Sequence, residues 1–218
     1  MSETRTRPER KRRSDGERSR NAILREAAQL ATVEGLDGLS IGRLADAVGM
    51  SKSGLFAHFG SKEELQLATI DTAGALFAED VIEPASKGKT GLQRLQRLAE
   101  NYLRHIEGAY PGGCFFAALA AEMDTHPGPV RDRAAAFTDE WLGQLETAIQ
   151  DAKAEGAIDA SEDPEQLAFE LEAYLLLANA LFVIGQSSAP IDQARRALKR
   201  RLAAAAPATG AGRRSGRG

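Results

Sequence analysis

The chain has 218 residues and a formal net charge of −3 at pH 7; 43% of its residues are hydrophobic and 6% are aromatic. This size fits one domain, or a small domain joined to a medium one, and the abundance of Ala and Leu favours helices over strands. The single cysteine, Cys114, excludes an intrachain disulfide, and the charged N-terminus lacks the apolar core of a secretory signal, so we expect a cytoplasmic protein. The longest uncharged stretch, from Ala173 to Ile191, is too interrupted by polar residues to predict a membrane span, which needs about 20 apolar residues.

Charge is distributed unevenly along the chain. Residues 1–62 carry 12 Lys/Arg against 8 Asp/Glu, residues 63–194 carry 8 against 23, and residues 195–218 carry 8 basic residues and no acidic one. A basic N-terminal part followed by an acidic central part indicates that one end of the chain binds a polyanion. The alternative is that the basic ends are tails of targeting or expression origin.

Helical periodicity runs through the chain between two polar ends, and no segment alternates in polarity for long enough to predict a strand. The fold is therefore predicted to be all-α, with about nine helices: a three-helix N-terminal domain followed by a larger helical domain. The predicted helices span 18–34, 41–48, 51–59, 61–81, 91–106, 114–123, 130–155, 164–185 and 190 to about 206.

Both ends of the chain are predicted to be disordered and basic. Residues 1–17 are rich in Arg, lack apolar periodicity and contain Pro8 and Gly16, so we expect a disordered arm. Residues 207–218 are mostly Gly, Ala and Arg, and we expect a disordered tail there.

Two short helices joined by a tight turn form the centre of the first domain, which we place at 18–64. Ser40 and Ser51 are suitable N-caps for the two helices. Ala45 is small where the helices cross, and Gly49 tolerates the left-handed conformation of the turn. These features predict a helix-turn-helix; a compact helical hairpin without DNA-binding function is the alternative.

The run from Ile41 to Leu65 resembles the DNA-binding segment of TetR-family regulators. It reads Ile-Gly-Arg-Leu-Ala-Asp-Ala-Val-Gly-Met-Ser, later Leu-Phe-Ala-His-Phe, and then Ser-Lys-Glu-Glu-Leu, and the likeness extends over about residues 19 to 66. The resemblance implies a recognition helix over 51–59 that lies in the major groove of double-stranded DNA. The DNA contacts that it implies are Ser40, Arg43, Ser51, Lys52, Ser53, Gly54, Phe56, His58 and Lys62.

These implied contacts have different roles. Ser40 and Arg43 would contact the DNA backbone, while Ser53 and Gly54 lie where many members of the family read bases. Lys62 would bind phosphate with help from the N-terminus of its own helix. Phe56 departs from the family, which usually has Tyr there; the loss of the hydroxyl predicts slightly weaker backbone anchoring, although Phe can contact a thymine methyl.

The cations at the two ends have two interpretations each. The arm either enters a flanking minor groove and raises affinity, or is merely solvated. The tail is expected to be a solvated end. The residues concerned are Arg5, Arg7, Arg10, Lys11, Arg12 and Arg13 in the arm, and Arg213, Arg214 and Arg217 in the tail.

The second domain, at 65–206, is predicted to bind an effector and to dimerise. Its helix over 164–185 is apolar nearly all round and must be covered on several sides. The core of a monomer could cover it, but the resemblance implies a homodimer through the last two helices, which would bind a palindromic operator.

The remaining helices are expected to enclose a pocket for a small-molecule effector. An effector that fits one spacing of the two DNA-binding heads better than the other would release the protein from DNA. Aromatic residues at helical spacing are often plain core, which is the alternative for each candidate. The candidate lining residues are Phe77, Tyr102, His105, Tyr110, Phe116, Met123, Trp141, Tyr174 and Asn179.

The sequence offers little for catalysis. His58, His105 and His126 lie far apart, and there is no phosphate-binding glycine loop, so we expect no enzyme, no metal and no cofactor. Cys114 with His105 could act as a nucleophile and base, but its apolar surroundings favour a buried structural thiol. Three hypotheses stand: a repressor released by a ligand, which the motifs favour; a constitutive DNA-binding regulator; and a Cys114-dependent thiol sensor or enzyme.

Overall fold

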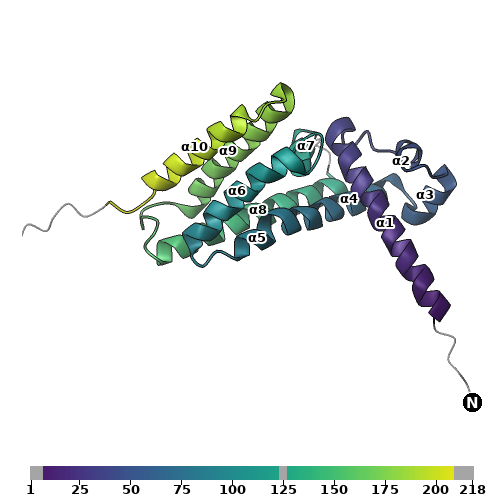
Figure 1. The fold of residues 1–218 in the computed structure, drawn as a ribbon, viewed down its shortest axis with the longest axis horizontal. Helices are drawn as coiled ribbons and strands as arrows, with labels where there is room; N and C mark the ends of the chain where they lie inside the picture. The colour runs from purple at the N-terminus through teal and green to yellow at the C-terminus, as the bar shows by residue number, and fades with distance from the viewer. Residues whose placement is uncertain (1–6, 123–126, 209–218) are drawn as a thin grey trace, which may run out of the picture. The chain divides into compact units, whose positions relative to one another are not determined.

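The computed structural model describes residues 7–122 and 127–208. These residues form ten α-helices and one π-helical turn and contain no strand, which confirms the all-α prediction (Figure 1). The helices are α1 (Arg7–Glu34), α2 (Ile41–Val48), α3 (Lys52–Phe59), α4 (Lys62–Phe77), η1 (Ala78–Ile82), α5 (Glu83–Ser86), α6 (Gly91–Gly108), α7 (Phe115–Glu122), α8 (Pro129–Ala154), α9 (Pro164–Gly185) and α10 (Ala189–Ala204).

The N-terminal helix is longer than predicted. α1 begins at Arg7, so the expectation of disorder was wrong for residues 7–17. Pro8 stands in the first turn, where a missing N–H leaves no hydrogen bond unmade, and the Glu, Arg and Lys that follow are good helix formers. A single glycine, Gly16, therefore does not interrupt the helix. Residues 1–6 and 209–218, which hold the rest of the predicted arm and most of the predicted tail, lie outside the described residues.

The fourth predicted helix is also longer in the structure. α4 passes at Ala78 into the π-helical turn η1, and α5 follows directly. Pro84, which lies outside the predicted helices, occupies the first turn of α5, where proline is tolerated.

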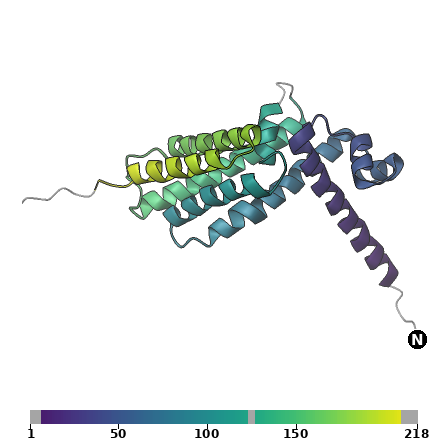
Figure 2. The same ribbon diagram turned by 45° about the horizontal axis from the view of Figure 1, so that its top comes forward.

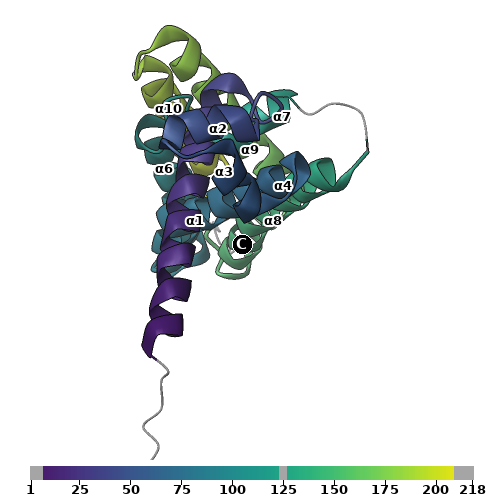
Figure 3. The same ribbon diagram turned by 90° about the vertical axis from the view of Figure 1, so that its right-hand side faces the viewer.

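Contacts divide the chain into two compact units that interleave in the sequence. The first contains residues 1–77 and 109–137, and the second contains residues 78–108 and 138–218. The first unit thus adds α4, α7 and the start of α8 to the three helices predicted for the N-terminal domain. Figure 3 looks onto α1, α2 and α3 of this unit.

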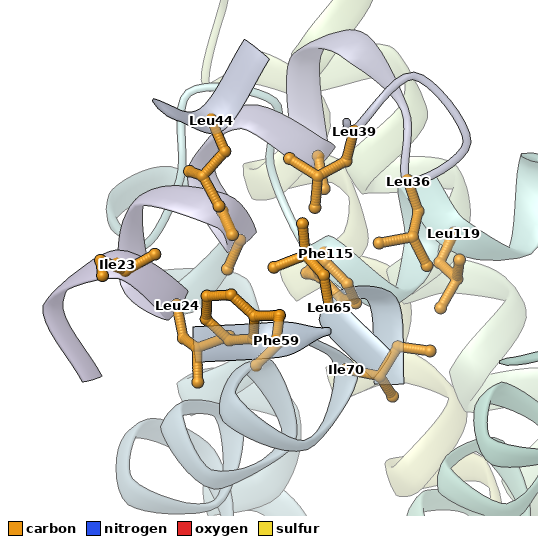
Figure 4. Packing of buried hydrophobic residues seen from close by; sticks show 14 of the residues in the cluster. Ile23, Leu24, Leu36, Leu39, Leu44, Phe59, Leu65, Ile70, Phe115 and Leu119 are labelled. Carbon is orange, nitrogen blue, oxygen red and sulfur yellow. The ribbon is translucent and has the colours of Figure 1, made fainter. Parts of the chain in front are cut away.

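The first unit has an apolar core that holds the short helices in place. Leu44 on α2 and Leu55 on α3 are fully buried, together with Leu65 on α4. Figure 4 shows Leu24 of α1 close to Phe59, and Phe115 of α7 close to Leu65. Each such side chain contributes about 1.5–3 kcal/mol when it leaves water, so the core compensates for helices too short to be stable alone.

The second unit is a bundle in which α6, α8, α9 and α10 lie side by side (Figure 2). Gly91 allows the start of α6 to approach α8 closely, because a Cβ there would lie 2.2 Å from the backbone nitrogen of Ala152. Arg195 of α10 binds Glu100 of α6, with 2.9 Å between Nε and the carboxylate. Close backbone packing at the start of α6 and an ion pair near its middle thus align these helices.

One helix of this bundle, α9, leaves an apolar face uncovered. Phe169 is 66% exposed, Leu177 is 59% exposed and Ile184 is 81% exposed, although the opposite face is buried. A helix of this composition needs to be covered on all sides. The described residues leave one side of it exposed. By length and composition α9 is also the one described helix that could cross a membrane, a test that the core helices of soluble proteins pass as well.

Candidate nucleic-acid interface

The α2–turn–α3 segment has the local geometry that its sequence predicts. The Ser40 hydroxyl accepts a hydrogen bond from the backbone N–H of Arg43 at 3.1 Å, and the Ser51 hydroxyl accepts one from Gly54 at 3.1 Å. Gly49 ends α2 with a φ of +66°, in the left-handed region that favours glycine. The predicted caps and turn of the helix-turn-helix are therefore confirmed.

The outer face of α3 is open to solvent. Leu55 and Phe59 point into the core, whereas Lys52, Ser53 and Ala57 are exposed. Phe56 is 54% exposed, which is unusual for an aromatic side chain on a helix that already buries two apolar residues. An eight-residue helix with a cation at its start and an apolar ring in its middle can contact both the backbone and the bases of a duplex.

Gly42 of α2 supports the position of Lys52, a role that sequence analysis missed. A Cβ at Gly42 would lie 3.3 Å from Cε and 3.4 Å from Nζ of Lys52. The lysine side chain therefore crosses α2 at the one position in the first turn without a side chain. A glycine near the start of a helix was the only signal in the sequence.

Two cations predicted to bind phosphate are engaged within the unit. The guanidinium of Arg43 binds both carboxylate oxygens of Glu34, with Nε 2.9 Å from each. The ammonium of Lys62 donates to the backbone carbonyl of Asp37 at 2.7 Å. The carboxylate of Glu34 raises the pKa of Arg43 above its ordinary value, so this guanidinium stays charged. Each cation thus already uses part of its donor set within the unit, and these acceptors compete with phosphate for it.

Arg20 of α1, which is not among the predicted site residues, fixes the C-terminal end of α3. It donates to the backbone carbonyl of His58 at 2.6 Å, and its guanidinium lies 4.5 Å above the ring of Phe59. This arrangement combines a charge-assisted hydrogen bond with a cation–π contact. His58, predicted to approach DNA, is half-buried beside Phe59 rather than fully exposed.

The candidate pocket residues fall into both compact units. In the first unit, Phe77 and Phe116 form an aromatic cluster with Phe137, in which Phe116 and Phe137 stack face to face and Phe77 meets both edge-on. Tyr110 is also buried in this unit. These aromatic side chains pack closely together, as residues of a hydrophobic core do. Met123 lies outside the described residues.

In the second unit, three helices bring together a polar cluster in apolar surroundings. The rings of Tyr102 and Trp141 lie 5.5 Å apart between centroids, and the indole Nε1 of Trp141 donates to Glu172 at 2.7 Å. Burial raises the pKa of Glu172 to about 7, an effect that the bond from Trp141 partly opposes. Tyr102 and Trp141 are among the predicted pocket residues, whereas no pattern in the sequence points to Glu172.

The other candidates of this unit are also placed. His105 is buried with its Nδ1 3.1 Å from Asp80, and burial lowers its pKa more than this carboxylate raises it. Asn179 is buried and Tyr174 is half-buried. A groove of about 470 Å³ between α6 and α10 has a lining that includes none of the predicted pocket residues. The position of the effector pocket therefore stays a prediction.

Two family models match this chain. The model of bacterial regulatory proteins of the tetR family matches residues 23–69, which include α2, α3 and the C-terminal part of α1, and the model of tetracyclin repressor-like C-terminal domains matches residues 91–198. A crystal structure of a TetR transcriptional regulator from Chloroflexus aurantiacus shares 28% identity, with a TM-score of 0.81 over 87% of this chain and 96% of that one. The chain belongs to the TetR family.

TetR-family relatives are named as regulators or repressors, which confirms the prediction that the chain is a DNA-binding transcriptional regulator and not an enzyme. The repressor AcnR of Corynebacterium efficiens is 40% identical over 65 residues, which are 30% of this chain and 35% of that protein. The match thus spans about a third of that relative. AibR, solved in complex with isovaleryl coenzyme A and operator DNA, is 24% identical, with a TM-score of 0.65 over 82% of this chain and 95% of that one.

Proposed function

We propose that this TetR-family chain is a cytoplasmic, homodimeric repressor that binds a palindromic operator and leaves it when a small molecule binds the second unit. The observation that carries the proposal is the outer face of α3, where Lys52, Ser53 and Phe56 are exposed on a helix capped at both ends. A single helix of this length contacts too few bases for high specificity, so two copies related by a twofold axis are needed.

The DNA contacts divide into backbone and base contacts. Ser40, Arg43 and Lys62 lie at or near helix starts and are exposed, which suits phosphate binding. Ser53 and Phe56 stand on the outward face of α3, which suits base edges and thymine methyl groups.

The dimer interface is assigned to α9 and α10. Phe169, Leu177 and Ile184 recur at helical spacing along the exposed face of α9, and water would otherwise surround them. A hollow of about 130 Å³ between the two helices is lined by side chains of both, among them Leu181 and Ala194. An identical pair of helices would fill this hollow and bury the apolar stripe.

The effector is assigned to the second unit. AibR was solved in complex with isovaleryl coenzyme A and operator DNA, so a protein of this fold can hold a small molecule and DNA. The cluster of Tyr102, Trp141 and Glu172 supplies both apolar contact and a carboxylate inside the bundle. The fully buried thiol of Cys114 does not favour the thiol-sensor hypothesis, because reactive cysteines are partly accessible.

The DNA-binding proposal is tested by selecting bound duplexes from a random pool and measuring affinity by fluorescence anisotropy. We expect a palindromic consensus whose two halves lie about one helical turn apart. Ser53→Ala should change the preferred bases, whereas Lys52→Ala should weaken binding to all duplexes. Binding without preference among duplexes would overturn the proposal.

The dimer is tested by analytical ultracentrifugation. Ile184→Glu places a charge on the exposed face of α9 and should shift the protein to monomers. Val33→Glu is the matched control, since Val33 is 64% exposed on α1, which belongs to the other compact unit, and should leave the dimer intact. Equal behaviour of the two variants would rule out the assigned interface.

Release by a ligand is tested by adding a metabolite library to the preformed operator complex. Loss of anisotropy with one chemical class would support the repressor. If no compound released the operator, the constitutive alternative would be favoured.

A further inference from the structure

The groove between α6 and α10 has an apolar floor. It lies within the second compact unit and has a volume of about 470 Å³. Small-molecule sites in proteins measure about 300–1,000 Å³, so the groove has the size of such a site. The floor consists of four side chains that line the groove and are themselves buried, namely Ala99, Leu103, Leu198 and Leu202.

The two helices that form the walls run in opposite directions. The start of α6 lies beside the end of α8, because the backbone N–H of Gly91 donates to the carboxylate of Glu155 at 2.8 Å. The end of α10 lies there too, because the carbonyl of Ala205 accepts a hydrogen bond from the backbone N–H of Asp159 at 2.8 Å. Moving forward along α6 therefore means moving backward along α10.

The rim of the groove carries one ion pair and one unpaired cation. Glu100 of α6 and Arg195 of α10 bind each other, with 2.9 Å between the carboxylate and Nε. Four residues away on each helix, about 6 Å along the groove, the opposite directions bring Gln96 and Lys199 to the same level. Among the described residues, neither of these two side chains has a hydrogen-bond or ion-pair partner. Lys199 thus holds a positive charge above an apolar floor, opposite a neutral amide.

We propose that this groove binds an apolar molecule with one anionic headgroup, of the chemical class of a fatty-acid carboxylate. The apolar chain lies on the floor, and the headgroup binds the ammonium of Lys199 by a charge-assisted hydrogen bond. The amide of Gln96 can donate a second hydrogen bond to the same headgroup. The groove shares no residue with the cluster of Tyr102, Trp141 and Glu172, so this site is additional to the proposed effector site.

Two parts of the protein itself suit the groove less well. Residues 209–218 follow the end of α10, but they contain three arginines, no acid and a single hydrophobic residue, Ala211. They would bring charge of the same sign to Lys199 and almost no apolar surface to the floor. A second copy of the chain presents the apolar face of α9, which is already assigned to the dimer interface.

The first test measures the binding of two probes by isothermal titration calorimetry at neutral pH, below the concentrations at which they form micelles. Decanoate and decyltrimethylammonium carry similar apolar chains and opposite charges. We expect decanoate to bind, with an affinity that falls as the salt concentration rises, and the cation to bind several times more weakly. Absence of decanoate binding, or equal affinity for the two probes, would overturn the proposal. The measurement needs no DNA, so its outcome is independent of operator binding.

The second test removes the charge at the proposed headgroup position. Lys199→Gln should lower the affinity for decanoate by up to about fivefold, the most that an exposed ion pair contributes, and should abolish the preference for the anion. Arg200→Gln is the matched control, because Arg200 is the next residue of α10 and is also exposed, but lines a different hollow together with Tyr174. Equal losses in the two variants would show attraction by the general positive charge of α10 and would contradict the assigned headgroup position.

The third test fills the groove. Ala203 lines the groove at an exposed position, so Ala203→Trp should keep the fold and abolish decanoate binding. Ala154→Trp is the control, because Ala154 is exposed in the last turn of α8 and does not line the groove. Decanoate binding that survives Ala203→Trp would place the ligand elsewhere and refute the site. Analytical ultracentrifugation of the same variants is the final check: a loss of the dimer in Ala203→Trp and Lys199→Gln alone would assign the groove to a second copy of the chain instead.

Discussion

Glu172→Gln is expected to change how the stability of the protein depends on pH. In the wild type, burial raises the pKa of this carboxyl group to about 7, from an ordinary value of 4.5. Between these two values the folded state binds more protons than the unfolded state, so the free energy of unfolding falls as the pH rises. The full loss corresponds to about 3 kcal/mol above pH 7, because one pKa unit equals about 1.4 kcal/mol.

The variant keeps an oxygen that can accept the indole hydrogen bond of Trp141 but cannot ionise. Its free energy of unfolding should therefore match that of the wild type near pH 4.5 and exceed it by up to about 3 kcal/mol at pH 8. Burial lowers the pKa of His105, which adds an opposite dependence as the pH falls below 6.5. Both proteins carry His105, so the difference between them isolates Glu172.

The assay is urea unfolding at a series of pH values and one protein concentration, followed by the fluorescence of Trp141, the only tryptophan in the sequence. The single fluorophore lies at the perturbed group, so it reports local and global unfolding together. A stability difference that did not vary with pH would refute the reasoning, because it would show that the carboxyl group ionises freely in the folded protein.

Three further predictions concern the cores and the interface. Gly49→Ala should lower the free energy of unfolding by about 1–2 kcal/mol, because a φ of +66° strains any residue with a side chain. Gly143→Ala, inside α8, should raise the free energy of unfolding by up to about 1 kcal/mol. Urea unfolding measures both changes, and a change of the same sign in the two variants would contradict a conformational cause. Leu145→Ala should destabilise by about 2–5 kcal/mol, since the side chain is fully buried; a loss under 1 kcal/mol in the same assay would mean that the bundle collapses around the cavity. Glu34→Gln should release Arg43 and raise operator affinity by up to about fivefold, because an exposed pair contributes about 0–1 kcal/mol, and an unchanged affinity would show that Arg43 makes no phosphate contact.

Local signals made the helix-turn-helix predictable. Ser40, Gly49 and Ser51 act within four residues of themselves, through a cap or a left-handed turn, so their positions alone specify the geometry. The start of α1 was missed because Pro8 and Gly16 are usually breakers, although proline in a first turn costs nothing. The effect of a cap, a glycine or a proline can thus be predicted from the sequence where its position within the helix is known. Where that position is not known, the same residue can lead to a wrong helix boundary.

Long-range contacts could not be predicted in the same way. Glu122 of α7 accepts a hydrogen bond from the backbone N–H of Leu36 at 2.7 Å, across a separation of 86 residues. Glu172 similarly meets Trp141 only because α8 and α9 pack together. No periodicity encodes which acid on a helix turns inward, so the sequence analysis found the aromatic residues of the second unit and not their carboxylate.

The acids beside the DNA-binding helices give the interface a further property. Glu34 holds Arg43, and Asp37 holds Lys62 through its backbone carbonyl, with its carboxylate 4.0 Å from the ammonium. Exposed pairs of this kind contribute about 0–1 kcal/mol, so a phosphate can displace them at small cost. The same displacement is needed at the operator and at random sites, so its cost is equal in the two complexes. These acids therefore lower the affinity for every duplex that Arg43 and Lys62 would contact, and they leave the ratio of operator binding to non-specific binding unchanged.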